Sequence, residues 1–585
     1  MQPSEGAWPA GDEGRNVLLF AQLLREMVAE RTFESFRVYS LGTVSRLDEA
    51  IALIEDVQRN RLPREALEPV VQEMLWSFDK DPIAGLSAGL EIAALSELVQ
   101  QQKPRLSDLA ANIKLIKRLL SWGYKTALEQ RIIDLFDTPR RRIELRQACG
   151  FYCSHLINVG FSKLWIQELV EEAFFTEDMS TANRTTLAQF FRKFVENPAD
   201  FVVFTSIGYE LSRLLPSLGL RVVAPKDVDQ SVRAALESSG EELAHVAISE
   251  ERAYDPYGAI NAVHERLTSI RAFTYLRRET IACDWEELMY VRGADVKVGR
   301  AIRTSGFNFE RLTKATPTRA TITSQRKYIL RVRQNFDPPS MERLLSSINT
   351  AALARTSPNR ENQLISLWSA VEVLLSEPPT NTARIVSYVH QLVPAICLRH
   401  VRRQFVAVFE ELRLLYPQAF TNILRGEDEF ASHDPHTNFA AVICLEENEL
   451  LREELCALLE ENPLALHRLF KLYRDYGSSG EAAKAIKSHR NRVEWQVHRI
   501  YRARNQLVHS GRVPSYLDSL ILNLAEYYGA AVATIIDRAR REPSRSDIDQ
   551  IVSEIGIEYG IFTRQFKATE APLQRADLER LVAVP

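Results

Sequence analysis

The chain has 585 residues, of which 45% are hydrophobic and 26% are charged, so it is long enough for several domains and has a globular composition. This composition excludes collagenous, low-complexity and wholly disordered chains. The formal net charge is -4, from 73 Lys and Arg against 77 Asp and Glu. A chain with this balance is not basic throughout, so any surface that attracts nucleic acid must be local.

The N-terminal sequence and the cysteines both indicate a cytoplasmic protein. Residues 1–16 combine acidic residues, Pro and Gly, whereas a signal peptide needs a basic start and an apolar core. The six cysteines are scattered without a CxxC pair, which is typical of reduced thiols. We see no apolar run close to the ~20 residues that cross a bilayer, and therefore expect no contact with a membrane.

The hydrophobic pattern predicts a mainly α, multidomain fold. After a disordered lead over 1–15, apolar residues recur at three- and four-residue spacing through 16–215, which predicts a helical N-terminal domain. Short β-branched runs follow over 216–337, the last of them at 319–336, and predict a mixed α/β module. From 338 to 545 the helical spacing returns and predicts a helical bundle.

The remaining residues, 546–585, are expected to form a C-terminal helical tail.

Several short motifs could bind a metal ion, carry out redox chemistry or contact phosphate, but each also fits a purely structural interpretation. The HDPH cluster at His433–His436 fits either a metal site or a solvated turn at its proline. Cys149 and Cys153 fit either a redox pair or buried structural thiols. The basic run Arg140–Arg142 with Arg146 fits either phosphate contact or a solvated helix face. We find no phosphate loop, GxGxxG, HExxH or GxSxG motif.

The most informative segment is RNRVEWQVHRIYRARNQLVHSGRVP, over residues 490–514. On a helix, its apolar residues form one stripe: Val497, Ile500, Tyr501, Leu507 and Val508. Arg504 lies near the middle of this stripe, with Asn505 at its edge and His509 at the helix end before Gly511. A buried guanidinium is costly alone, so Arg504 is expected to meet a carboxylate, a polar cleft or a dimer interface that holds phosphate.

The same segment is locally basic. Residues 481–514 contain eight Lys and Arg but only two acidic residues, an excess of six positive charges that would attract a nucleic-acid backbone. We predict RNA contacts from four of the cations: Lys487, Arg499, Arg502 and Arg512. A second Arg and His pair, Arg492 with His498, has similar spacing, which is expected by chance, and we predict that it tolerates substitution.

The string YRARNQLVHSG resembles the hallmark of HEPN domains, and its RN-x-φ-V-H-S-G form is similar to the Apea-like HEPN branch. The match extends upstream to LISLWSAVEVLLSE, where Trp368 and Glu372 match an LW-x-A-φ-E arrangement of that branch. The resemblance covers about 340–540, a third of the chain. Some 130 residues separate the two motif helices, so the HEPN-like bundle carries an insertion at about 392–480.

The resemblance implies a dimeric helical bundle that acts as a metal-independent endoribonuclease. It implies that Arg504 stabilises the charged transition state, that Asn505 positions the phosphate or the histidine, and that His509 moves a proton. Glu372 would orient Arg504, and Tyr501 would support the site. A histidine and a guanidinium can carry out this chemistry, so we expect no metal and no cofactor.

The resemblance also sets the expected partners: RNA, a second copy bound through the C-terminal bundle, and an operon-encoded or phage-derived protein. The role implied is a regulated antiviral or toxin effector, with the first 330 residues as sensor or restraint. One alternative is a catalytically silent HEPN-like module that dimerises or binds nucleic acid. In that case Arg504 forms an ion pair with Glu372, His509 stabilises the helix end, and Tyr501 and Trp368 serve in core packing.

Overall fold

The computed structural model describes most of the chain. The described residues are 12–29, 39–85, 91–100, 105–136, 142–175, 183–237, 245–276, 281–303, 319–357, 359–376, 384–425, 434–541, 547–566 and 571–582.

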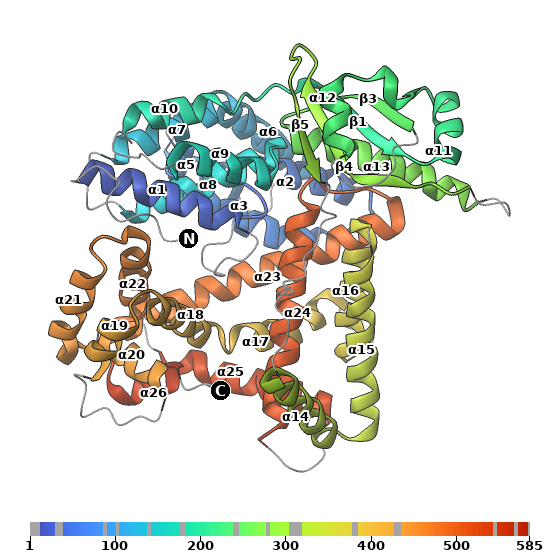
Figure 1. The fold of residues 1–585 in the computed structure, drawn as a ribbon. Helices are drawn as coiled ribbons and strands as arrows, with labels where there is room; N and C mark the ends of the chain where they lie inside the picture. The colour runs from blue at the N-terminus through green and yellow to red at the C-terminus, as the bar shows by residue number, and fades with distance from the viewer. Residues whose placement is uncertain are drawn as a thin grey trace.

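Helices form the N-terminal region, which lies at the top left of Figure 1. They are α1 (Asp12–Val28), α2 (Thr43–Gln58), η2 (Arg64–Leu67), α3 (Glu68–Lys80), α5 (Ile92–Gln100), α6 (Leu106–Ser121), α7 (Tyr124–Leu135), α8 (Arg142–Val159), α9 (Lys163–Phe174) and α10 (Arg184–Arg192). Two apolar cores hold this region together. One core joins α1 with α7, α8, α9 and α10, and the other joins α2, α3, α5 and α6. The 3.6-residue period of the sequence therefore predicts these helices correctly.

A five-stranded antiparallel sheet follows, with the strand order β2-β3-β1-β4-β5. Its elements are β1 (Ala199–Ile207), α11 (Tyr209–Leu214), η3 (Leu215–Leu218), β2 (Arg221–Val223), η4 (Pro225–Asp227), α12 (Gln230–Glu237), β3 (His245–Ala253), α13 (Pro256–Thr274), β4 (Trp285–Gly293) and β5 (Arg300–Arg303). Side chains alternate between its faces, so Val203 packs in the core with α13, whereas Phe204 packs with α12.

Two boundaries of the predicted α/β module differ from the structure. β1 begins at Ala199, before the predicted start at 216, and a short turn over 193–198 separates it from α10. The β-branched run at 319–336 is not a strand, since α14 (Arg319–Asn335) occupies it. Strand propensity depends on a sheet face to pack against, and here the Gln, Arg, Lys and Leu residues favour a helix.

The bundle predicted for the C-terminal region is present, and the fold is mainly α as predicted. Its helices are α15 (Pro338–Thr356), α16 (Arg360–Leu374), α17 (Arg384–Cys397), α23 (Ser479–Ser510), α24 (Leu517–Ala539) and α25 (Ile548–Gln565). α16, α17 and α24 all contact α23, while α25 packs on α17 and α24. The predicted C-terminal tail therefore contributes one helix to the bundle.

The insertion between α17 and α23 forms a lobe of short helices on the left of Figure 1. It contains α18 (His400–Leu415), α19 (Pro417–Arg425), α20 (Pro435–Cys444), η5 (Glu446–Asn448), α21 (Glu449–Leu458) and α22 (Pro463–Tyr476), and α26 (Arg575–Val582) packs on it. α22 also contacts α1, where buried Arg468 pairs with Glu26 at 3.0 Å. The lobe thereby links the bundle to the N-terminal region.

Within the described residues, α24 is the one helix that is long and apolar enough to cross a membrane by composition. More than half of its apolar window is buried, against α16, α17 and α25. This burial is typical of the core helix of a bundle, and it explains an apolar run that the sequence interpretation missed.

Candidate functional site

The candidate site lies at the C-terminal end of α23, a 32-residue helix. Ser478 caps its start, because the hydroxyl accepts a hydrogen bond from the amide of Glu481 at 3.3 Å. Gly511 ends it in the left-handed conformation, with φ of 63°, and its amide donates to the Leu507 carbonyl at 3.1 Å. The predicted helix end at Gly511 is thus present, with His509 in the last turn.

Arg504 is held by two neighbours. Its Nη2 lies 3.1 Å from Oε2 of Glu372 on α16, and its Nη1 donates to Oδ1 of Asn505 at 3.1 Å. The other carboxylate oxygen of Glu372 accepts from Nε1 of Trp368 at 2.9 Å. Two segments that are 132 residues apart in the chain therefore meet at Arg504, as the resemblance implies.

The Arg504 side chain lies at the edge of the core rather than inside it. It is 22% exposed and Glu372 is 24% exposed, so neither is sealed by apolar packing. Nε of Arg504 is buried and finds no hydrogen-bond acceptor among the described residues. Two of the five N–H groups of the guanidinium are thus used in these bonds, and its charge is balanced by the carboxylate of Glu372.

Aromatic side chains support this network from below. Trp368 is fully buried, and its ring lies 5.5 Å from that of Tyr501 and 5.9 Å from that of Tyr388. Burial, together with the negative charge of Glu372, raises the pKa of Tyr388. Tyr501 packs against the bundle core, so its role in this structure is to support Trp368.

His509 is exposed and lies apart from this network within one chain. Residues five positions apart on an α-helix are offset by about 140° around the axis and about 7.5 Å along it. Val508, predicted to join the buried stripe, is instead 48% exposed. We attribute this difference to the helix end, which lies next to the exposed residues 509–513 rather than beneath another helix.

Two of the four predicted RNA ligands serve another purpose. The guanidinium of Arg499 is 1% exposed and contacts both carboxylate oxygens of Glu49, at 2.9 and 2.7 Å. It also pairs with Glu73, and Arg502 lies 2.7 Å from Glu49. Glu73 in turn accepts from Nε of Arg46 at 3.2 Å. We call these five residues the interdomain ion-pair cluster, since they join α2 and α3 to the middle of α23.

Mutual charge keeps the cluster ionised despite its burial. Burial alone would raise the pKa of Glu49, but the charges of Arg499 and Arg502 lower it to about 2. Burial would likewise lower the pKa of Arg499, but Glu49 and Glu73 raise it well above its usual value. Because their charges are satisfied by the N-terminal region, we exclude Arg499 and Arg502 from the RNA surface proposed below.

The sequence interpretation did not identify Glu49 and Glu73. Each lies more than 400 residues from Arg499, on helices whose acidic residues resemble ordinary solvated ones. The signal available was Arg499 itself, which lies four residues after Trp495 and four before Ala503, two buried residues on the same face of the helix.

The other two predicted RNA ligands are exposed. Lys487 lies about 25 Å before Arg504 along the helix, where it lines a groove with Trp495 and Gln72. Arg512 follows the helix end directly. Any RNA that touches Lys487 and Arg504 together must therefore extend along α23.

The cysteine pair and the part of the HDPH cluster that the structure describes have structural roles. Burial raises the pKa of Cys149 well above its usual value and that of Cys153 to about 12, so both are protonated thiols at neutral pH. His433 lies outside the described residues, while Asp434 caps α20 and pairs with Arg402 at 2.7 Å. No group of three metal-ligating side chains occurs in the described part of the chain.

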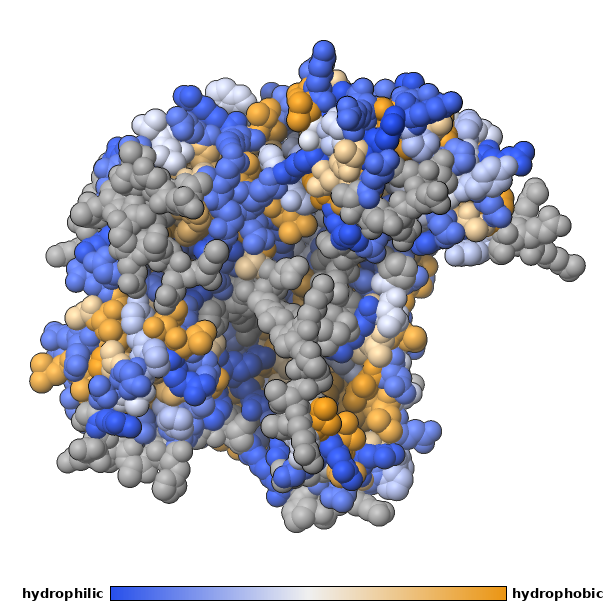
Figure 2. Space-filling model, in the orientation of Figure 1, coloured by the Kyte–Doolittle hydropathy of each residue, from blue (hydrophilic) through white to orange (hydrophobic). Residues whose placement is uncertain are grey.

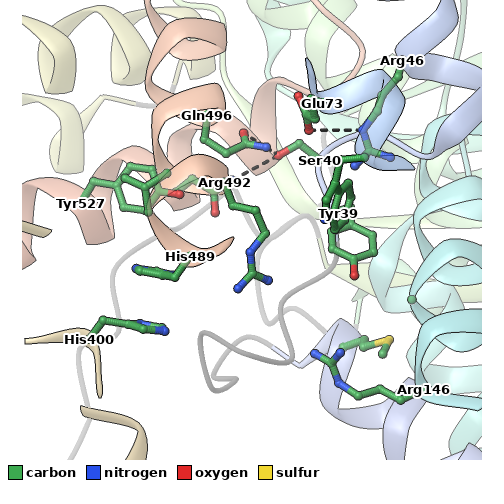
Figure 3. A pocket seen from close by; sticks show the side chains of 15 residues that line it. Tyr39, Ser40, Arg46, Glu73, Arg146, His400, His489, Arg492, Gln496 and Tyr527 are labelled. Atoms are coloured by element: carbon green, nitrogen blue, oxygen red, sulfur yellow. Dashed lines mark hydrogen bonds and ion pairs between the residues drawn. The ribbon is translucent and has the colours of Figure 1, made fainter. Parts of the chain in front are cut away.

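The second Arg and His pair differs from the first in its surroundings. Burial and the nearby charge of Arg502 lower the pKa of His498 to about 4, so this imidazole is neutral at pH 7. Arg140 and Arg141 lie outside the described residues, and Arg146 faces an interior cavity (Figure 3).

Comparisons with known proteins leave the chain without an assigned relative. No family model matches it, and no curated protein or solved structure does so either.

Proposed function

We propose that this protein is a metal-independent endoribonuclease of HEPN type that acts in the cytoplasm as a regulated antiviral or toxin effector. The observation that supports this function is the contact of Arg504 with Glu372 and with Asn505, five residues before the exposed His509 on the same helix. The guanidinium is oriented by a carboxylate and is partly exposed. These are the properties required of a group that binds phosphate.

In the proposed reaction the ribose 2′-hydroxyl attacks the adjacent phosphorus. His509 takes the proton from this hydroxyl or gives one to the departing 5′-oxygen, and the products are a 2′,3′-cyclic phosphate and a free 5′-hydroxyl. Arg504 stabilises the extra negative charge on the phosphoryl oxygens, and Asn505 fixes the position of Arg504. None of these steps needs a metal ion.

A homodimer through the C-terminal bundle would complete the site. A single chain supplies one His509, offset from Arg504 around the helix, whereas two chains supply a separate acid and base. Exposed apolar residues are available near the helix end and on α15: Val508, Val513, Leu345, Ile348 and Leu353. Hydrophobic surface is visible in Figure 2 on the right-hand side, where α15 lies.

The N-terminal region is the proposed restraint. It holds the middle of α23 through the interdomain ion-pair cluster, which begins five residues before Arg504. A movement of α2 and α3 would therefore be transmitted to the helix that carries the proposed site. An operon-encoded or phage-derived partner that binds this region would act by changing that contact.

The second candidate is a catalytically silent module that binds nucleic acid or dimerises. The ion pair between Arg504 and Glu372 favours it, because the carboxylate also satisfies Arg504 without RNA. In that case Arg504 would have only a structural role.

The two candidates are separated by incubating the purified full chain with total RNA in the presence of EDTA. For the proposed nuclease, cleavage occurs, leaves 2′,3′-cyclic phosphate ends and fails on DNA. His509→Ala and Arg504→Ala each reduce the rate by about 10²-fold or more, as expected for loss of a proton donor or a charge partner.

His498→Gln is the matched control, because it removes a second histidine from the same helix, and it should retain the activity of the wild type. The chain should also elute as at least a dimer at micromolar concentration. Three results would contradict the proposal: cleavage that depends on a metal ion, a loss of cleavage rate in His498→Gln equal to that in His509→Ala, or a dimer that does not cleave RNA.

A further inference from the structure

Helix α14 presents a basic and apolar face that no described element covers. Its 17 residues include five Lys and Arg and no Asp or Glu. Among the described elements, none makes more than a marginal contact with α14, although Val332 near its end reaches the core of the bundle. Most helices in proteins are stabilised by the packing of one face, so α14 lacks the support that a partner surface would provide.

The exposed side chains of α14 form two adjacent stripes. Ile322 and Ile329 are seven residues apart, and each is more than half exposed. Arg326 and Arg333 have the same spacing, are exposed, and form no ion pair with a described residue. At about 100° per residue, these four side chains lie within about 60° around the helix axis. We call them the basic face of α14.

Helix α21, in the insertion lobe, presents a face of opposite charge. Together η5 and α21 contain five Glu and one Arg, and Arg452 is used within the lobe, where it donates to the Ile443 carbonyl at 3.1 Å. Leu450 is 80% exposed. Around the helix axis it lies between Glu453 and Glu454, which are exposed and form no ion pair with a described residue. We call these three residues the acidic face of α21.

The two faces do not meet within one chain. In Figure 1, α21 lies at the far left of the molecule and α14 at the lower right, with α25 between them. α21 packs on α19 and α20, and α14 shares no extended contact with any of these helices. Their opposite charges and exposed apolar residues therefore fit a contact between two chains.

We propose that the basic face of α14 docks on the acidic face of α21 in a second copy of this chain. The isoleucines of α14 pack on Leu450, and its arginines pair with the two glutamates beside that leucine. A stable interface buries about 1,200–2,000 Å², which is more than one pair of short helices covers. The contact is therefore made twice, across a two-fold axis, with α14 of each chain on α21 of the other.

Two other occupants use less of the exposed surface. RNA would pair with the arginines but would leave the isoleucines unburied. An anionic bilayer would accept both stripes of α14 but would leave the acidic face of α21 without a partner. A second copy accounts for both faces. The contact includes no residue of the site at Arg504, so it does not rest on the proposed ribonuclease activity.

The test is sedimentation velocity of the full chain without RNA, at about 0.05 M and about 0.5 M salt. The higher salt should weaken association by about tenfold or more, because exposed charges are screened. One variant, Arg326→Glu with Arg333→Glu, reverses the basic face, and a second, Glu453→Lys with Glu454→Lys, reverses the acidic face. Each variant alone should associate about tenfold or more weakly than the wild type at low salt.

A mixture of the two variants is the decisive measurement. Each unaltered face then meets its unaltered partner, and the two reversed faces attract one another, so the mixture should regain the affinity of the wild type. Lys114→Glu with Arg118→Glu is the matched control, because these exposed cations lie one turn apart on α6 beside exposed Leu115. This control should change the affinity by less than about twofold.

A thermal melt verifies that each variant folds, and the salt dependence of the wild type tests the contact without any variant. The proposal is overturned if association does not depend on salt, if the mixture associates no better than either variant alone, or if the control weakens association equally. It is also overturned if reversal of the basic face abolishes binding to RNA or to anionic vesicles but leaves self-association intact. Dimerisation through the bundle involves none of these charges, so such a failure would leave the proposed function standing.

Discussion

The middle and the end of α23 use the same residue type in opposite ways. In the middle, Arg499 is buried and paired with Glu49 and Glu73 from the N-terminal region. At the end, Arg504 is partly exposed and shares one carboxylate, that of Glu372. An excess of basic residues along a helix therefore does not define a nucleic-acid surface, because acidic residues from another domain can neutralise part of it. The contrast separates a buried region that joins the helix to the N-terminal helices from a helix end whose guanidinium is partly exposed.

The largest expected effect is loss of the interdomain contact. Arg499→Ala leaves Glu49 and Glu73 buried with fewer cations, and should destabilise the chain by about 3–5 kcal/mol. The measurement is thermal unfolding, combined with limited proteolysis to detect separation of the N-terminal region.

Arg490→Ala is the control, since its pair with Glu494 is exposed and should contribute about 0–1 kcal/mol. Equal effects of the two substitutions would remove the distinction between the buried middle of the helix and its surface.

The second effect is a dependence of stability on pH at His498. Its pKa of about 4 in the folded chain lies below the usual 6.5, so the neutral form is the one that folding favours. Stability from this group is complete above pH 6.5 and is lost as the pH falls from 6.5 to 4, by up to about 3 kcal/mol.

Denaturant unfolding of the wild type and of His498→Gln at pH 7 and pH 5 would measure how much of the free energy of unfolding depends on the titration of His498. The variant should lose less stability between the two pH values. An identical loss would show that His498 does not titrate in this range.

The third effect tests how Glu372 acts on Arg504. If the proposed activity is present, Glu372→Gln should lower kcat by about tenfold and leave KM close to the wild-type value, because the amide keeps the shape but holds the guanidinium less firmly. Glu372→Asp, which keeps the charge, should recover part of the rate. A change confined to melting temperature would instead indicate a purely structural ion pair.

The smallest effect concerns the exposed cations. Lys487→Ala and Arg512→Ala should each weaken RNA binding a few-fold and reduce the dependence of log affinity on log salt by about one. If only Arg512→Ala weakens RNA binding, the RNA lies at the helix end. If both substitutions weaken RNA binding, the RNA extends along α23. No effect from either would place RNA elsewhere.

Much of the fold and part of the site follow from the sequence. The apolar spacing predicts the helical regions, and Gly511 predicts where α23 ends. The contact of Glu372 with Arg504 was expected from two motifs that lie far apart in the chain. The start of β1 and the helical state of α14 were not predicted, because β-branched residues indicate a strand only where a sheet face is available to pack against, and the sequence does not show where that face lies.

The sequence by itself therefore determines which residues can form the helix, where the helix ends and which side chains carry positive charge. Only the tertiary structure decides which of those charges are available. Arg499, Arg502 and Arg504 lie within six positions on one helix, yet two are neutralised by Glu49 and Glu73, whose positions depend on how the N-terminal helices pack. The physical reason is that a cation's function depends on its solvent exposure and on nearby carboxylates, and packing sets both.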